Sequence, residues 1–241
     1  MTMKKQSNIY ALLYSVGLVL VVGVVLSVIY QSLRPTQQEN EANDMKAQIL
    51  RAALISGEGK DIPTLFDEHV VRSYIVDYHG NIVNQDPQAA FAACQNMSAE
   101  IKKAPDSRLL PVFECKTDQG LKYIIPVYGA GLWGPIWGYV AFDSNGDTIY
   151  GAYFAHQGET PGLGAEIEKP AFSDQFRGKD IFSGHGRFTS VKVCKPGQEP
   201  QEGAYVNGVS GGTITSQGVD KMLRESLEPY TEYLKKLGTN R

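Results

Sequence analysis

The feature that most constrains this chain is an uncharged apolar run near its start, at residues 9–29 (IYALLYSVGLVLVVGVVLSVI). As an α-helix rising about 1.5 Å per residue, this run is roughly 30 Å long, which matches the hydrocarbon core of a bilayer. A cleaved signal peptide is the alternative, but its apolar core usually has about 7–15 residues and ends at small residues. Here the run is longer and is followed by YQSLRP. The sequence therefore predicts an uncleaved transmembrane helix over residues 9–30.

Charged residues on the two sides of this run predict its orientation. Lys4 and Lys5 precede it, whereas Arg34 and several acidic residues follow it. Basic residues are retained on the cytoplasmic side, so residues 1–8 are expected in the cytoplasm. The rest of the chain is then expected on the periplasmic, outer face of the inner (cytoplasmic) membrane. No second apolar run of spanning length occurs in the sequence, so one pass is expected and a pore formed by this chain alone is excluded.

The remainder of the chain has the size and composition of one globular domain. The protein has 241 residues and a formal net charge of −3, which leaves room for a sizeable core. The basic residues are scattered, and this argues against nucleic acid as a partner. Cys94, Cys115 and Cys194 do not have the spacing of a metal site. One disulfide plus a free thiol, or three free thiols, both remain open.

Periodicity after the anchor predicts an α+β domain. Residues 31–57 are expected to form a polar stem that becomes helical from Ala42 and stops near Gly57, and residues 58–241 the soluble domain. Several strands with helices gathered at both ends indicate a mixed or mainly antiparallel sheet with flanking helices. The expected strands are 71–76, 82–83, 109–115, 121–127, 139–142, 148–154, 188–194 and 204–206, and the expected helices are 62–70, 89–101 and 217–237.

The motif SGGTITS, at residues 210–216, stands directly before the last expected helix. Gly211 and Gly212 allow a close approach to the backbone, and Thr215 or Ser216 is the expected N-cap. The first turn of a helix presents unpaired N–H groups and the positive end of the helix dipole. The motif therefore suits a phosphate, although an ordinary capped helix after a glycine turn is the simpler alternative.

Two further glycine-bearing motifs occur earlier in the chain. HQGETPGLG, at residues 156–164, follows an expected strand and predicts a loop with a tight turn. His156 and Glu159 lack a third ligand at a suitable spacing, so no metal site is expected. Such a loop could offer backbone N–H groups and the side chain of Leu163 to a flat ring. LWGPIWG, at residues 132–138, could supply an aromatic wall for the same ring, although core packing is the commoner use of such tryptophans.

The order of the three motifs is more specific than each motif alone. GLWGPIWGY, HQGETPGLGAEI and SGGTITSQGV, in this order, resemble the FMN-binding domain of NqrC, the C subunit of the sodium-translocating NADH:quinone reductase. The corresponding subunit of Rnf-type electron-transfer complexes has the same domain. The anchor, the stem and the chain length are more similar to the quinone reductase subunit. The resemblance extends over essentially the whole chain and is firmest over residues 128–223.

This resemblance implies covalently bound FMN. In the family, the threonine of an S-G-A-T-type motif carries FMN through a phosphoester bond, which a flavin transferase makes with FAD as the donor. The motif here is Ser210-Gly211-Gly212-Thr213, so the resemblance places the flavin on Thr213. Two positions depart from the family pattern. Gly212 stands where alanine is usual, and Asn207 stands where an acidic residue is usual.

The resemblance also implies the other contacts of the flavin. Trp133 and Leu163 are expected to flank its ring system. Glu159, Thr160 and Gly164 are expected to hydrogen-bond the flavin or its ribityl chain. The phosphate end is expected to be lined by Ser210, Thr215 and Ser216. Lys195 is expected to neutralise the phosphate charge or, alternatively, to be a solvated lysine in a turn.

The implied function is electron transfer within a membrane complex. The flavin would do the redox chemistry, and no catalytic side chain is expected beyond it. The G-x-G-x-x-G at residues 129–134 (GAGLWG) leads from one expected strand into another and not into a helix, so it is not the nicotinamide-binding form of this motif and NADH is expected to bind to another subunit. The expected partners are the other membrane subunits of the quinone reductase, which this subunit would serve as a redox relay without a complete activity of its own. An Rnf-type subunit and a cofactor-free, membrane-anchored binding module remain the alternatives.

Overall fold

The computed structural model describes residues 8–239, which form two compact units that divide between Met45 and Lys46. The first unit consists of most of helix α1 (Asn8–Ala52). Its apolar side chains are exposed along residues 9–33. The helix is long enough to cross a membrane and contains an apolar stretch with a mean hydropathy of 2.7. The expected polar stem is not a separate segment, because the helix runs through it and includes Pro35.

The second unit is built on a six-stranded sheet in the order β2-β1-β3-β4-β5-β6, and every neighbouring pair in it is antiparallel. A two-stranded parallel sheet, β7 with β8, lies outside it. The prediction of a mainly antiparallel sheet in an α+β fold is therefore confirmed. The strands are β1 (Val70–Val76), β2 (Ile82–Asn84), β3 (Leu110–Thr117), β4 (Gly120–Ala130), β5 (Pro135–Phe142), β6 (Ile149–His156), β7 (Lys192–Cys194) and β8 (Tyr205–Asn207).

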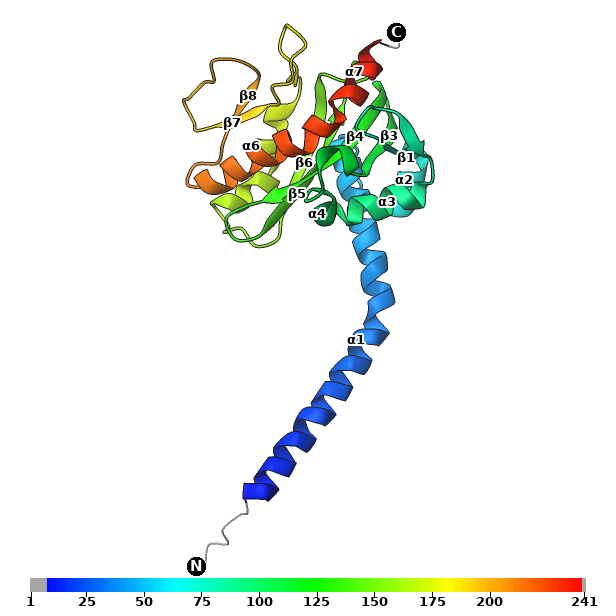
Figure 1. The fold of residues 1–241 in the computed structure, drawn as a ribbon, viewed down its shortest axis with the longest axis vertical. Helices are drawn as coiled ribbons and strands as arrows, with labels where there is room; N and C mark the ends of the chain where they lie inside the picture. The colour runs from blue at the N-terminus through cyan, green and yellow to red at the C-terminus, as the bar shows by residue number, and fades with distance from the viewer. Residues whose placement is uncertain (1–7, 240–241) are drawn as a thin grey trace, which may run out of the picture. The chain divides into compact units, whose positions relative to one another are not determined.

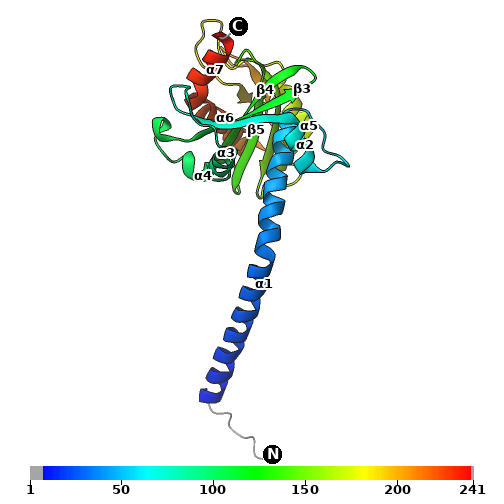
Figure 2. The same cartoon turned by 90° about the vertical axis from the view of Figure 1, so that its right-hand side faces the viewer.

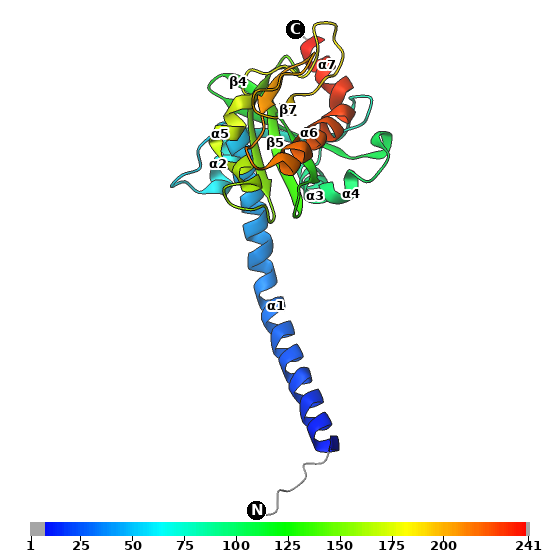
Figure 3. The same cartoon turned by 90° about the vertical axis from the view of Figure 1, so that its left-hand side faces the viewer.

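One face of the large sheet is covered by helix α6 (Thr213–Leu227), which lies across β4 (Figure 1). The helix comes close to the strand because two glycines leave room for it. A Cβ at Gly218 would strike the carbonyl of Ala130, and a Cβ at Gly129 would strike Met222. Beside α6, on the side seen in Figure 3, β7 packs against the helix. Shorter helices complete this side of the core: η2 (Gly164–Glu168), α5 (Pro170–Ser173), η3 (Asp174–Phe176), η4 (Glu228–Tyr230) and α7 (Thr231–Thr239).

The other face of the sheet packs against α2 (Ile62–His69), α3 (Pro87–Gln95) and the last two turns of α1, which belong to the same unit (Figure 2). Ile49 and Leu50 are fully buried there, and Trp137 donates its indole N–H to Gln48 at 3.0 Å. The short helices α4 (Met97–Glu100) and η1 (Pro105–Ser107) lead from α3 to β3. The end of α1 is thus a structural part of the domain.

Several element boundaries differ from the sequence-based expectation. The helix expected over residues 217–237 begins earlier, at Thr213, and is divided into α6, η4 and α7. Pro229 stands in the first turn of η4, and it has no N–H to continue the ladder of α6. The helix expected over residues 89–101 is likewise divided into α3 and α4. The strand expected over residues 188–194 is reduced to β7, and Phe188 forms only an isolated bridge with Phe182.

The three cysteines are free thiols, so no disulfide forms in the described chain. Cys94 and Cys115 are buried, and burial raises the pKa of each thiol to about 12. Buried, protonated thiols are poor nucleophiles. The alternative of three free cysteines therefore holds, and these two act as small apolar core residues.

Candidate functional site

The site is organised around the start of α6, which has no side-chain cap. Gly212 is its N-cap residue, and the N–H of Ser216 donates to the Gly212 carbonyl at 2.8 Å. The expectation of Thr215 or Ser216 as N-cap is therefore wrong, because the helical hydrogen bonds already begin at Gly212. By contrast, Asp61 caps α2 and Asp86 caps α3. The first-turn amides of α6 lack such an internal carboxylate, and this leaves them available to an external anion.

The turn before α6 is fixed by a serine and a glycine. The N–H of Val209 donates to Ser216 Oγ at 2.9 Å, and the N–H of Gly212 donates to the Val209 carbonyl at 3.1 Å. Gly211 has φ +77°, a left-handed conformation that favours glycine. As a result, the side chain of Thr213 is exposed at the first position of the helix.

A hollow of about 490 Å³ lies beside Thr213. It is formed by the turn before α6, the first turn of α6 and the segment that follows β7. Lys195 lines the hollow and supplies a positive charge. The structure thus brings together five of the residues that the sequence predicted for the phosphate end: Ser210, Gly211, Thr213, Ser216 and Lys195.

Glu159 links the three motifs from the inside. Its carboxylate accepts the N–H of Trp133 at 2.9 Å through Oε1 and the hydroxyl of Thr215 at 2.6 Å through Oε2. Its side chain is buried, and glycines stand on two sides of it. A Cβ at Gly131 or at Gly164 would strike one of the carboxylate oxygens. The sequence predicted that Glu159 and Thr215 both contact the cofactor. In the structure, the carboxylate of Glu159 and the hydroxyl of Thr215 bind each other instead.

The ionisation of Glu159 reflects two opposing effects. Burial raises the pKa of its carboxyl group, whereas hydrogen bonds from Thr215 and from the Trp133 and Leu132 amides lower it by more. The nearby His156 lowers it further, so the pKa lies below its ordinary value of 4.5. His156 accepts the N–H of Glu159 at Nδ1, 3.2 Å away, and its Nε2 lies 3.6 Å from Glu168. Within residues 8–239, no group of three metal-ligating side chains includes this pair.

Exposed apolar side chains surround the start of α6. Trp133 is 69% exposed, Ile214 is 54% exposed and Leu163 is 43% exposed. Leu163 lies directly against Gly211, because a Cβ added to that glycine would stand 2.6 Å from Leu163 Cδ2. Thr160 is also exposed, and its carbonyl accepts the N–H of Leu163 at 3.1 Å. Such an exposed apolar group beside a polar hollow is typical of a ligand site.

Two of these features were not predicted from the sequence. Ile214 is exposed beside the site and was missed. A large apolar residue within the otherwise polar motif SGGTITS was the signal that could have identified it. Gly131 was not singled out, because its role depends on the position of Glu159, which lies 28 residues later in the numbering. No local pattern connects the two.

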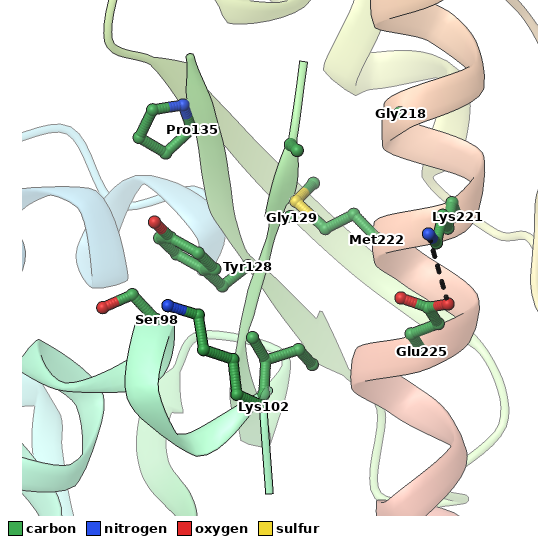
Figure 4. A pocket seen from close by; sticks show the side chains of 11 residues that line it. Ser98, Lys102, Tyr128, Gly129, Pro135, Gly218, Lys221, Met222 and Glu225 are labelled. Atoms are coloured by element: carbon green, nitrogen blue, oxygen red, sulfur yellow. Dashed lines mark ion pairs between the residues drawn. The ribbon is translucent and has the colours of Figure 1, made fainter.

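A second hollow, of about 460 Å³, lies on the other side of α6 (Figure 4). Tyr128, Lys102 and Met222 point into it from β4, the α4 region and α6. Lys221 and Glu225 pair with each other at 3.8 Å along its α6 wall. It contains none of the residues predicted for the cofactor, so it is separate from the site at Thr213.

Comparison with known proteins shows the family to which this part of the chain is similar. Residues 131–228, which include all three motifs, match the family described as the FMN-binding domain. Among curated proteins, the chain is 33% identical over 222 residues to the C subunit of the Na(+)-translocating NADH-quinone reductase of Vibrio campbellii, covering 85% of this chain and 84% of the relative. The Chlamydia caviae protein of the same name is 29% identical, with 93% and 91% covered.

Two solved structures are also similar. The C subunit of the Na(+)-translocating NADH-quinone reductase of Parabacteroides distasonis is 45% identical with a TM-score of 0.74, and the match covers 84% of this chain and 96% of that one. NqrC of Shewanella oneidensis is 25% identical with a TM-score of 0.67, and the match covers 84% and 100%. These two structures therefore have the same α+β fold as this chain.

Proposed function

Because the chain belongs to the NqrC family, the C subunits of the Na(+)-translocating NADH-quinone reductase, we propose that it is a membrane-anchored protein that carries FMN and relays electrons within that complex. The match of residues 131–228 to the FMN-binding domain supports the cofactor. The name shared by the relatives supports the quinone reductase over an Rnf-type complex. The exposed apolar group beside an uncapped helix start argues against a cofactor-free binding module.

The proposed attachment point is the hydroxyl of Thr213. It is exposed, stands at the first position of α6 and borders the hollow that Lys195 lines. In the attachment step, Thr213 Oγ would form a bond to the FMN phosphorus of FAD while the bond to the AMP oxygen breaks. AMP leaves, and the hydroxyl proton passes to a base of the flavin transferase. The step is a phosphoryl transfer and needs no oxidant.

The residues of the site would hold the two ends of the cofactor differently. The first-turn amides of α6 and the ammonium of Lys195 would stabilise the phosphate charge. Trp133, Leu163 and Ile214 would provide apolar contact for the ring system and reduce its exposure to water. FMN supplies the acceptance and donation of electrons. Thr160 and Gly164, beside Leu163, remain the proposed polar contacts of the ribityl chain.

The predicted membrane anchor determines on which side of the membrane the domain lies. We place residues 1–8 in the cytoplasm and the domain on the outer face, because Lys4 and Lys5 precede the span. The partners are then the other membrane subunits of the complex, together with a flavin transferase for maturation.

Peptide mass spectrometry of the protein isolated from its own membrane tests the proposal. We expect the peptide that contains Thr213 to carry the mass of FMN less one water. T213V should abolish the flavin fluorescence of the denatured protein band, whereas T213S, which keeps a hydroxyl, should retain part of it. An unmodified Thr213 peptide in the wild-type protein would refute the attachment. A flavin that survives in T213V would mean that the attachment point is another residue, such as Thr215.

A further inference from the structure

The carboxylate of Glu159 joins parts of the site that are far apart in the sequence. Trp133 belongs to the connection between β4 and β5, Glu159 to the loop after β6, and Thr215 to the first turn of α6. The two carboxylate oxygens accept one hydrogen bond from each of the other two segments. If FMN is bound as proposed, these segments contact opposite ends of it, the ring and the phosphate.

We propose that Glu159 is a positioning residue, which sets the ring-contacting loop at Trp133 relative to the phosphate-binding start of α6 without touching the flavin. This inference rests on the proposed function, but it changes the role expected for Glu159 from the sequence, where the residue was a direct ligand of the flavin. The structure supports the change, because only 5% of the Glu159 surface is exposed. Gly131 and Gly164 enclose the carboxylate with backbone on both sides.

A carboxylate suits both partners, because the Trp133 amide and the Thr215 hydroxyl each donate to one of its two charged oxygens. A glutamine of the same shape accepts at its oxygen only, and its N–H₂ group donates, so the Thr215 hydroxyl has to turn and accept instead. The substitution therefore replaces two hydrogen bonds to a charged group with weaker neutral ones. The Trp133 loop and the start of α6 would then be held less tightly to each other.

The first experiment needs no flavin. The full chain is produced without a flavin transferase and solubilised in detergent, and amide hydrogen exchange is measured at Trp133. In E159Q, we expect exchange at this amide to accelerate about tenfold or more, because hydrogen bonds to charged groups contribute more than neutral ones. E168Q is the matched control, since it removes a carboxylate that pairs with the same His156 but contacts neither segment. Unchanged exchange in E159Q, or equal acceleration in E168Q, would overturn the proposal.

The second experiment uses the flavin-loaded full chain and separates ring position from attachment. Flavin content is measured by mass at the Thr213 peptide, and ring mobility by the anisotropy decay of flavin fluorescence. In E159Q we expect an attached flavin with a faster anisotropy decay. T215V, which removes the second donor, should give the same change and remains informative if E159Q does not fold. T215S, which restores the hydroxyl, should return the decay toward the wild-type value.

The two proposals fail in different ways. A wild-type protein without flavin on Thr213 would refute the proposed attachment, while the exchange experiment would still decide the role of Glu159. A loaded E159Q or T215V protein with the wild-type anisotropy decay would refute the positioning role and leave the proposed function standing. An anisotropy decay that changes in T215V and is not restored in T215S would also count against the positioning role, since the change would then not depend on the hydroxyl.

Discussion

The two adjacent glycines before α6 have different roles at the scale of single residues. Gly211 has a left-handed conformation, and a side chain there would also strike Leu163. Gly212 has φ −102°, and a Cβ would stand 3.2 Å from the side chain of Val209 and 3.3 Å from Gly164 Cα. Only the first position therefore requires glycine, and the second tolerates the alanine that the resembling family has there after a small adjustment.

We accordingly predict that G211A lowers the free energy of unfolding by about 1–2 kcal/mol, the cost of a left-handed conformation for a residue with a Cβ. The matched variant G212A should lower it by less than about 1 kcal/mol and should keep full flavin loading. Chemical denaturation of the full chain in detergent measures the first quantity, and flavin absorbance per chain the second. Equal losses in the two variants would show that backbone conformation is not what distinguishes them.

The lowered pKa of Glu159 predicts a pH dependence of stability. A carboxyl group whose pKa is lower in the folded than in the unfolded protein stabilises the fold above its unfolded value and loses this contribution as pH falls through its folded value. The loss is therefore expected below pH 4.5, the ordinary value of the group. The unfolding free energies of wild type and E159Q should differ most at neutral pH and converge as the pH falls below that value. Denaturant titrations at each pH test this, and a constant difference would mean that the charge of Glu159 does not contribute.

The residues of the site differ in how visible they are in the sequence. Thr213 and Gly211 lie within one short motif, and a glycine turn with hydroxyl groups before a helix indicates an anion site from local chemistry alone. The pairing of Glu159 with Thr215 could not be inferred in the same way, because they meet only through the fold. The carboxylate was expected to face the flavin, since a polar residue in a glycine loop gives no sign of which partner takes its hydrogen bonds.

At the scale of elements, strands were easier to place than helix ends. The strands from β1 to β6 alternate or form short apolar runs between turn residues, and this pattern locates them within a few positions. The start of α6 was misplaced because its N-cap residue, Gly212, has no side chain to mark it. Its end was misplaced because the apolar spacing continues through Pro229 into α7, although the backbone ladder does not.

The uncapped start of α6 predicts that a covalently held phosphate stabilises the domain. A negative group at a helix N-terminus contributes about 0.3–2 kcal/mol, and salt screens this contribution. Protein made with the flavin transferase should therefore unfold with a free energy about 1 kcal/mol higher than protein made without it, and the difference should shrink at high salt. T213V is the control and should show no difference between the two preparations. A gain that is independent of salt would assign the effect to apolar contact of the ring instead.

At the scale of the whole molecule, the anchor and the domain have separate roles, and each can be tested on the full chain. If residues 9–30 are an uncleaved span, the mature protein retains its N-terminal residues and resists extraction from membranes by alkaline carbonate. A cleaved signal peptide would instead give a protein that lacks this segment and is extracted. Intact mass after isolation from the membrane distinguishes the two, and loss of residues 1–30 would contradict the anchor.

The orientation of the chain is set by the basic residues that flank the span. Lys4 and Lys5 precede the span and Arg34 follows it, so the larger number of basic residues favours a cytoplasmic N-terminus. A C-terminal alkaline phosphatase, which folds only outside the cytoplasm, should be active, and a C-terminal green fluorescent protein should be dark. Combining K4E and K5E with Q31K and S32K moves the larger number of basic residues to the other side of the span. Part of the protein molecules should then insert in the opposite orientation, which reduces phosphatase activity. A bright wild-type fusion would place the domain in the cytoplasm, where it could not serve partners on the outer face.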